Sequence, residues 1–195
     1  MSKVISAHSV SVDGYITGRD PRPGHGLGDG GVLFDWYFGG DTPSRQFDGF
    51  TLSGASAEVF DFHAGRLGAV VAGRTTFEDS DRFGGGSPHP NAELVLLTRR
   101  PADLTERQTL AGTIEDAVAK ARELAGGKDV GLMGGGVLNA ALRAGLVDEV
   151  VLHQVPVLLG HGRPFFQELP AHIGLSLVDV VPAPGVTHLR YEVAR

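Results

Sequence analysis

The sequence predicts an α/β fold, in which a mostly parallel sheet carries helices on both faces and ends in antiparallel edge strands. Two observations carry this prediction. Short apolar segments typical of buried strands alternate with segments whose apolar residues recur at helical spacing. The last two apolar segments, 175–181 and 186–193, are separated only by a proline- and glycine-containing turn, so we expect them to form a hairpin.

The N-terminal half supplies the first elements. Residues 3–12 are apolar and rich in β-formers, and they predict a strand buried on both faces. A glycine-rich loop over 18–50 follows. Apolar residues at helical spacing then predict a helix over 54–66. Residues 67–72 predict a short strand, which ends in a glycine turn that opens the next helix.

The second half repeats this alternation. Residues 94–97 predict a strand, and 114–125 predict a helix that begins at an approximate capping box and is stopped by two glycines. Residues 130–133 predict a strand that breaks into the three consecutive glycines 134–136. A short helix and a further apolar strand follow. The glycine run therefore stands between a strand end and a helix start.

Composition excludes several classes of protein. A chain of 195 residues with 42% hydrophobic and 21% charged residues predicts one soluble globular domain. The net charge of −6 argues against a nucleic-acid-binding protein. The absence of cysteine excludes disulfides, thiolate catalysis and cysteine-based zinc sites, and the eight histidines lack metal-site spacing, so we expect no metal. No signal peptide or membrane span is recognisable, which predicts a cytoplasmic protein without a membrane partner.

Three strand ends carry groups suited to phosphate. They are Gly73-Arg74-Thr75, Thr98-Arg99-Arg100 and Gly134-Gly135-Gly136, with a further hydroxyl on Thr76. Ligands bind outside the carboxyl ends of strands in open α/β sheets, and glycines at a helix start let backbone N–H groups approach an anion. Threonine hydroxyls and guanidinium groups add donors for phosphate oxygens. Three such ends favour a dinucleotide with a 2′-phosphate.

Each of these motifs also has a simpler interpretation. Three glycines in a row can be an ordinary turn, and two adjacent arginines can be a solvated loop end. The pattern is not the G-x-G-x-x-G fingerprint of the classical dinucleotide fold. The joint placement of the motifs at strand ends is what favours a ligand site.

Several segments, which follow one another in order along nearly the whole chain, carry a family resemblance: SVDGYI at 11–16, AGRTTFE at 72–78, GGG at 134–136, AGLVDE at 144–149 and PVLLG at 156–160. Through them the chain resembles the dihydrofolate-reductase-like superfamily, specifically the RibD C-terminal reductase type. The resemblance implies a single domain over 1–195, with a mixed, mostly parallel sheet of about eight strands flanked by helices. The H-x-E and P-C-x-x-C elements of the zinc deaminase that accompanies this domain in riboflavin-pathway enzymes are absent.

The resemblance also implies the cofactor NADPH and a place for each of its parts. The pyrophosphate would lie at the end of the strand and along the glycine run, against Met133, Gly134, Gly135, Gly136, Val137 and Leu138. The phosphates on the adenosine side would face Gly73, Arg74, Thr75 and Thr76, and the 2′-phosphate would meet Thr98, Arg99 and Arg100. Backbone groups near Ser9 and Ile16 would hold the nicotinamide carboxamide. The resemblance further implies a cis peptide bond in the glycine run, at Gly134–Gly135.

The substrate side has four candidate residues. Dihydrofolate reductases carry a carboxylate on the helix that precedes the Gly-Arg-Thr turn, and here that helix offers Glu58 and Asp61 as proton relays or as solvated surface residues. Asp13 is a candidate substrate contact or a turn former. Trp36 is the only tryptophan, and it can stack on a flat heterocycle or pack in the core.

These observations predict an NADPH-dependent reductase that transfers hydride to a C=N or C=O carbon of a small heterocyclic or ribosylaminopyrimidine-like substrate, with 18–50 as a closing loop. Two alternatives stay open: reduction of a folate, and an NADP(H)-binding sensor without turnover. The resemblance also implies a homodimer that pairs through the C-terminal strands.

Overall fold

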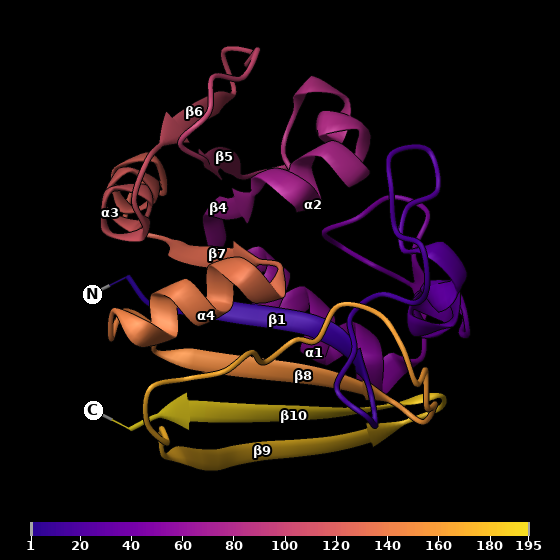
Figure 1. The fold of residues 1–195 in the computed structure, drawn as a ribbon. Helices are drawn as coiled ribbons and strands as arrows, with labels where there is room; N and C mark the ends of the chain where they lie inside the picture. Colours follow the sequence, from indigo (N-terminus) through magenta and orange to yellow (C-terminus); the bar gives the residue numbers. More distant parts are fainter. Residues whose placement is uncertain (1, 195) are drawn as a thin grey trace.

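The computed structural model describes residues 2–194, which form one eight-stranded sheet flanked by helices (Figure 1). The strands of this sheet are β1 (Val4–Ser11), β4 (Leu67–Gly73), β5 (Glu93–Leu97), β6 (Gln108–Ala111), β7 (Asp129–Met133), β8 (Glu149–Val155), β9 (Leu175–Ala183) and β10 (Val186–Val193). The α-helices are α1 (Gly54–Gly65), α2 (Arg74–Asp79), α3 (Ile114–Leu124) and α4 (Gly135–Arg143).

The strand order is β6-β5-β4-β7-β1-β8-β10-β9. Every pairing from β6 to β8 is parallel, and β10 pairs antiparallel with both β8 and β9. The predicted fold class is therefore confirmed, including the antiparallel C-terminal edge. The chain alternates strand and helix through the parallel part, so the carboxyl ends of β4, β5 and β7 lie at one edge of the sheet with the starts of α2 and α4.

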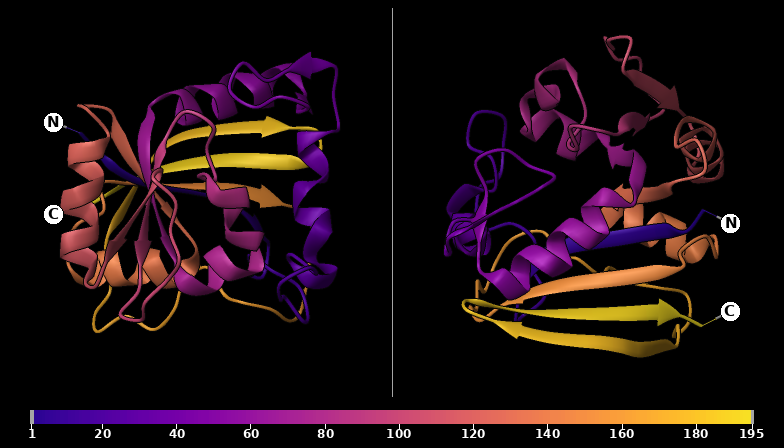
Figure 2. Two further views of the ribbon diagram at one scale, coloured as in Figure 1. Left: turned by 90° about the horizontal axis from the view of Figure 1, so that it is seen from above. Right: turned by 180° about the vertical axis from the view of Figure 1, so that it is seen from behind.

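The helices cover both faces of the sheet. Figure 2 shows α1 on one face and α4 on the other, and α3 contacts α4 as well as β4 and β5. The largest group of buried apolar side chains lies between the sheet and the α3–α4 layer, and a second group, around Leu33, Trp36 and Leu52, lies on the side of α1. The central strands β4, β5 and β7 are thus buried on both faces, which explains why their sequences are mostly apolar.

Two regions differ from the sequence-based prediction. Strand β6 was not predicted, because its sequence, QTLA, is short and follows a polar stretch. The glycine-rich segment 18–50 is more ordered than a loop, since it contains the 3-10 helix η1 (Gly28–Tyr37), and β2 (Thr42–Pro43) pairs with β3 (Thr51–Leu52). No helix within residues 2–194 has the length and apolar character needed to cross a bilayer.

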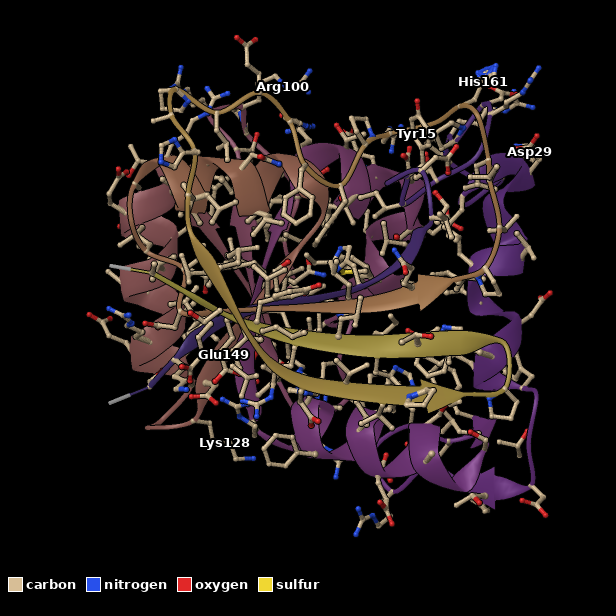
Figure 3. The ribbon with its side chains drawn as sticks, turned by 90° about the horizontal axis from the view of Figure 1, so that it is seen from below. Tyr15, Asp29, Arg100, Lys128, Glu149 and His161 are labelled. Atoms are coloured by element: carbon tan, nitrogen blue, oxygen red, sulfur yellow. The ribbon has the colours of Figure 1, made fainter. Side chains whose placement is uncertain are left out.

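An ionic cluster fixes the end of the sheet where β8 begins. The Glu149 side chain is buried, and it accepts hydrogen bonds from Lys3 and from Arg66, whose Nη1 lies 3.0 Å from Oε2. Arg66 also donates from Nε to Asp129 at 2.7 Å. Burial alone would raise the pKa of Glu149, but the bonds and charges of Arg66 and Lys3 exceed that effect and lower the pKa to about 2. Figure 3 shows Glu149 at the end of the sheet away from Tyr15 and His161.

Candidate functional site

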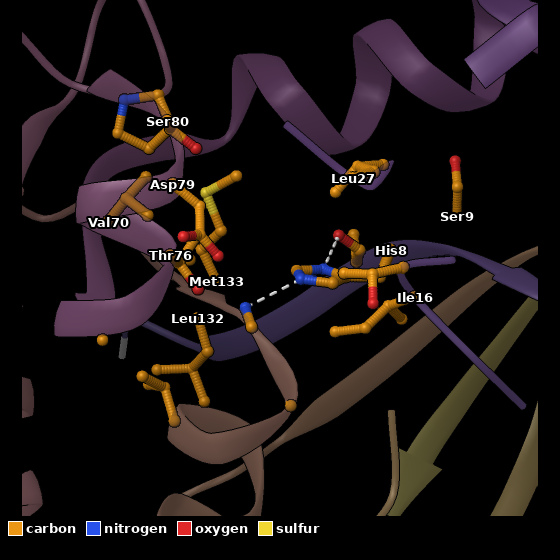
Figure 4. A pocket seen from close by; sticks show the side chains of 18 of the residues that line it. His8, Ser9, Ile16, Leu27, Val70, Thr76, Asp79, Ser80, Leu132 and Met133 are labelled. Atoms are coloured by element: carbon orange, nitrogen blue, oxygen red, sulfur yellow. Dashed lines mark hydrogen bonds between the residues drawn. The ribbon is translucent and has the colours of Figure 1, made fainter. Parts of the chain in front are cut away.

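A cavity of about 950 Å³ opens beside the carboxyl ends of the central strands. Its walls come from β1, the segment around η1, α1, β4, α2, β7 and the start of α4 (Figure 4). Most of the predicted cofactor residues line it: Ser9, Ile16, Gly73, Arg74, Thr75, Thr76, Met133, Gly134, Gly135, Gly136 and Val137. The volume is at the upper end of the range for small-molecule and cofactor sites, about 300–1,000 Å³.

The glycine run caps α4 and faces this cavity. Gly134 has φ 94°, a left-handed value that a side chain rarely adopts, and a Cβ there would lie 2.7 Å from Thr76 Oγ1. A Cβ on Gly135 would lie 2.6 Å from the Pro164 carbonyl oxygen. The protein's own backbone therefore requires these two glycines. Gly136 differs, because no protein atom lies within 4 Å of a Cβ at that position.

The predicted cis peptide bond in the glycine run is wrong. Every peptide bond within the described chain is trans. The positive φ of Gly134 redirects the backbone from β7 into α4, so the turn is made by a dihedral rotation that glycine tolerates.

His8 lies beside the glycine run, and the sequence did not point to it. Its Nδ1 is 2.5 Å from the Ala7 carbonyl oxygen, and its Nε2 accepts a hydrogen bond from the Gly134 N–H at 2.8 Å; dashed lines in Figure 4 mark both contacts. Its proton is therefore on Nδ1. Burial lowers the pKa of His8, only partly opposed by the bond to Ala7. The Gly134 N–H is thus occupied within the protein, and the amides open to an anion begin at Gly135.

On α2, the threonine hydroxyls and Arg74 have different surroundings. Thr75 and Thr76 line the cavity. The Arg74 guanidinium bonds to Glu78 at 2.7 Å and to the Pro101 carbonyl at 2.8 Å. Arg74 therefore fastens the loop after β5 to α2 while it lines the cavity wall. A phosphate would share this guanidinium with Glu78.

Four predicted cofactor residues lie outside the main cavity. Thr98 and Arg99 line a neighbouring hollow of about 420 Å³ together with Gly112 and Thr113, and Leu97 lines both spaces. Arg100 is exposed, and its backbone N–H donates to Thr98 Oγ1 at 3.2 Å. Leu138 is fully buried in the core beneath α4, so its side chain cannot touch a ligand in the cavity.

At the other end of the site, Ser9 and Ile16, the residues expected near the nicotinamide carboxamide, line the cavity, but their polar groups already have partners. The Ser9 hydroxyl accepts from Trp36 Nε1 at 3.0 Å, and the Ile16 N–H donates to the Arg163 carbonyl at 2.9 Å. Burial raises the pKa of Tyr37, which also lines the cavity, to about 12, although a bond with Ser9 acts in the opposite direction.

The two candidate carboxylates of α1 do not reach the cavity. Asp61 is buried against the segment between β2 and β3, where it accepts from Ser44 Oγ at 2.6 Å and from the Arg45 N–H at 3.0 Å. Burial by itself would raise the pKa of Asp61, but these bonds, together with the Arg45 charge, lower it. Glu58 is exposed and is not among the residues that line the cavity. The geometry gives both carboxylates positions unsuited to a proton relay.

The other two substrate candidates are structural in this geometry. Trp36 is 4% exposed and packs on Tyr37, with ring centroids 4.1 Å apart, and it is not among the residues that line the cavity. Asp13 is exposed and accepts from the backbone N–H groups of Leu159 and Gly160, at 3.1 and 2.7 Å. Hydrogen bonds, first that from Ser11, lower the pKa of Asp13. Core packing and turn formation, the second interpretation of each residue, agree with these contacts.

Buried histidines line the α1 side of the cavity, and the sequence did not single them out as a group. His63, His89 and His153 belong to this wall, and burial is the main cause that lowers the pKa of each. For His63 the pKa is about 4. Antiparallel pairing of β8 and β10 sets His153 opposite His188, a relation that no local sequence motif reveals.

One carboxylate, Asp79, lies among the described residues that line the cavity, and it is already paired. It binds Arg163, which also donates from Nη2 to the Pro21 carbonyl at 3.2 Å and from its backbone N–H to Thr17 Oγ1 at 2.9 Å. This ion pair joins α2 to the segment after β8 and to the glycine-rich segment. It closes one side of the cavity.

Comparison with known families supplies the classification. The profile of the RibD C-terminal domain family matches residues 2–188. The chain belongs to this family. Family membership supports a reductase, and the RibD C-terminal domain fold accounts for the position of the cavity at the strand ends. A comparison with curated proteins gives no match.

Solved structures agree on the fold. A protein from Shewanella sp. PV-4 described as a riboflavin biosynthesis protein superposes with a TM-score of 0.71 at 22% identity, with 100% of each chain covered. A pyrimidine reductase-like protein from Corynebacterium diphtheriae gives 0.59 at 16% identity, covering 100% of this chain and 92% of that one. Dihydrofolate reductase from Enterococcus faecalis, complexed with NADP(H) and RAB-propyl, gives 0.59 at 16% identity, with 99% and 97% covered.

Proposed function

We propose that the protein is an NADPH-dependent reductase that transfers hydride to a C=N or C=O carbon of a small heterocyclic, ribosylaminopyrimidine-like substrate. The observation that carries the proposal is the amino end of α4. There, amides from Gly135 onward face the cavity, and Gly136 has the open space that a closely approaching ligand needs. The family and the dihydrofolate-reductase-like fold support the same reaction class.

The residues present fit a dinucleotide. Its pyrophosphate would meet the α4 amides, because a helix start attracts an anion. Thr75 and Thr76 would donate to the adjacent phosphates, and the nicotinamide would lie toward Ser9 and Ile16. The cofactor supplies the hydride, and the chain supplies orientation and exclusion of water.

The hollow at Thr98 and Arg99 is the best candidate for the 2′-phosphate. It adjoins the main cavity through Leu97, and the exposed Arg99 lines it together with Thr98 and Thr113. A guanidinium beside hydroxyl groups suits a phosphate monoester. Arg100 would contribute charge from the same loop.

The cavity wall favours a heterocycle other than a folate. Within residues 2–194, Asp79 is the one carboxylate on the wall, and Arg163 already pairs with it. A pterin held by a carboxylate, as the folate alternative requires, lacks its partner here. Phe47, Phe60 and Tyr37 instead offer apolar surface to a flat ring.

Cofactor binding tests the first part of this proposal. Nicotinamide fluorescence should report tighter binding of NADPH than of NADH. In Arg99→Gln the preference should fall about tenfold, as expected for the loss of one charged contact worth about 1.4 kcal/mol. Arg122→Gln is the matched control, because Arg122 is exposed at the far end of α3. Equal affinities for the two cofactors in the unaltered protein would contradict the 2′-phosphate site.

Turnover tests the second part and separates a reductase from a sensor. The misplaced carboxylates Asp61 and Glu58 favour the sensor alternative, since neither can deliver a proton to the cavity. Oxidation of NADPH should be followed with a ribosylaminopyrimidine, dihydrofolate and a panel of carbonyl compounds. Turnover with the pyrimidine supports the proposal. Tight NADPH binding with no turnover by any of them would favour the sensor.

We also propose that two copies pair through β9. This edge strand exposes four large apolar side chains, Leu175, Leu177, Val178 and Val180. An exposed apolar edge strand is a ready surface for a second chain. Light scattering at micromolar concentration should give the mass of a dimer, and Leu177→Lys should give a folded monomer. A monomer in the unaltered protein contradicts this proposal.

A further inference from the structure

A row of polar side chains crosses three strands on the face of the sheet that α1 covers. The strand register pairs Ser9 of β1 with His153 of β8, and His153 with His188 of β10. His153 and His188 are 3% and 2% exposed, yet His153 is one of the residues that line the cavity. The row therefore connects the cavity wall to the interior of the antiparallel edge.

Hydrogen bonds continue this row to the start of α1. The Nδ1 atoms of His153 and His188 are 2.8 Å apart, and His188 Nε2 lies 3.0 Å from Ser56 Oγ. Ser56 Oγ lies 3.0 Å from Ser53 Oγ. Ser53 is the N-cap of α1 and is partly exposed, so the four side chains run from the protein surface to the cavity.

The donors and acceptors have a consistent direction. Ser53 Oγ accepts from the Ser56 N–H, so its own proton can point at Ser56 Oγ. Ser56 then donates to His188 Nε2, which leaves the His188 proton on Nδ1, directed at His153 Nδ1. In this arrangement His153 accepts at Nδ1 and carries its proton on Nε2. Within the described chain Nε2 has no hydrogen-bond partner, so it is the ring nitrogen left for a molecule in the cavity.

We propose that His153 Nε2 donates the proton that completes the reduction, and that His188, Ser56 and Ser53 replace it from solvent. The proposal rests on the proposed reductase function. A bound reduced nicotinamide would supply the hydride for the new C–H bond, and the π pair of the C=N or C=O group would move to the heteroatom. That atom takes the Nε2 proton. His153 Nδ1 takes the His188 Nδ1 proton, and His188 Nε2 takes the Ser56 proton. Ser56 then takes the Ser53 proton, and Ser53 takes one from a bulk water molecule, which leaves as hydroxide into the solvent.

The chain is needed because His153 is neutral. Burial, with a smaller effect of neighbouring histidines, holds the pKa of His153 well below 6.5, and burial lowers that of His188 to about 4. A neutral imidazole that gives up its Nε2 proton alone becomes an imidazolate anion in an apolar wall, at high cost. Simultaneous transfer from His188 to Nδ1 avoids this charge. After product release, water in the open cavity can return a proton to Nε2 and reverse the chain.

The first experiment reads the tautomers without any substrate. Long-range proton–nitrogen NMR of the ¹⁵N-histidine-labelled protein at pH 7 should show His153 protonated on Nε2 and His188 on Nδ1. His153→Gln and His188→Phe assign the signals. A bare Nε2 on His153, or an imidazolium ring, overturns the proposal, because no neutral donor would then face the cavity.

The second experiment breaks the chain without touching the cavity. Ser56→Ala should lower the single-turnover rate of NADPH oxidation by about a hundredfold with the most active compound of the panel, the lower bound for loss of a general acid. The substitution should also reduce the solvent isotope effect, which is the ratio of the single-turnover rates in H₂O and D₂O. The Kd for NADPH should change by no more than about twofold. His188→Phe, which keeps a ring against Trp36, should behave alike. Ser6→Ala is the control, because Ser6 is a buried serine whose hydroxyl bonds to Leu132 and stands outside the chain.

The outcomes separate the two proposals. NADPH binding and turnover that are unchanged in Ser56→Ala and His188→Phe overturn the relay and leave the reductase intact. If Tyr37→Phe lowers the single-turnover rate while Ser56→Ala and His188→Phe do not, the Tyr37 hydroxyl is the proton donor instead. Absence of NADPH binding in the unaltered protein overturns the proposed function, whatever the tautomers are. If no compound of the panel turns over, the NMR result alone decides whether the donor faces the cavity.

Discussion

The molecule buries two polar clusters in the same sheet, and they differ in charge and in access. The cluster of Lys3, Arg66, Asp129 and Glu149 is ionic and internally paired, and none of its four residues lines the cavity. The histidine row is neutral, has histidine and serine rather than carboxylate groups as its hydrogen-bond partners in the described chain, and ends at the cavity. Paired charges fix the strand ends in place. Neutral groups that can both donate and accept leave a proton free to move, so the second cluster is suited to chemistry.

The largest expected effect comes from breaking the ionic cluster. Glu149→Ala leaves Arg66 and Lys3 without their buried partner, and removal of one member of a buried pair costs about 3–5 kcal/mol. The midpoint of urea unfolding should fall accordingly. Glu192→Ala is the control, because its contact with Lys3 is exposed and exposed pairs contribute about 0–1 kcal/mol. A Glu149→Ala protein of unaltered stability would show that the cluster does not hold the strand ends.

The buried histidines His63 and His188 should instead make the protein sensitive to mild acid. His63 and His188 have a pKa of about 4 in the folded protein against 6.5 when unfolded. Between these values the unfolded chain binds more protons, so stability is complete above pH 6.5 and is lost as the pH falls toward 4, by up to about 3 kcal/mol per histidine. Glu149 has a pKa of about 2 in the folded protein against 4.5 when unfolded, so its contribution to stability is lost only as the pH falls below 4.5.

Urea unfolding between pH 4 and 7 separates the two contributions. His63→Leu should flatten the slope of stability against pH by the equivalent of one proton, since Leu cannot titrate. Exposed His172→Gln should leave the slope as it is. If acid sensitivity in the unaltered protein begins only below pH 4.5, the buried histidines are not the groups that titrate.

The sequence was sufficient for the features that depend on neighbouring residues. Strand–glycine–helix transitions at Gly73 and Gly134 were predicted because glycines stand between an apolar run and a helical pattern, and at Gly134 the positive φ requires glycine. The hairpin of β9 and β10 followed from its turn. Strand β6 was missed because a short edge strand with polar residues lacks a periodic signal.

Features that depend on distant residues could not be predicted. His8 meets Gly134 across 126 positions, and His153 meets His188 only through the register of β8 and β10. Asp61 was a reasonable candidate acid on its helix, but Ser44 and Arg45 fold back on it and satisfy its oxygens. In each case the partner, rather than the residue itself, decides the chemistry, and the partner is set by the tertiary fold.

The smallest expected effect is also the most selective, and it concerns Gly136. A Cβ at this position meets no protein atom within 4 Å, so Gly136→Ala should leave the fold intact and stabilise α4 by about 0.5–1 kcal/mol. The same methyl group would stand where a pyrophosphate approaches the α4 amides, so NADPH affinity should fall at least about tenfold, equivalent to 1.4 kcal/mol. Thermal unfolding and nicotinamide fluorescence measure the two effects on one protein. Gly145→Ala is the control with the opposite expectation. Its φ of 66° strains any side chain, so the free energy of unfolding should fall. Gly145 does not line the cavity, so the affinity for NADPH should stay the same. If Gly136→Ala binds NADPH as tightly as the unaltered protein, the anion site is not at the start of α4, and the glycine run is a turn.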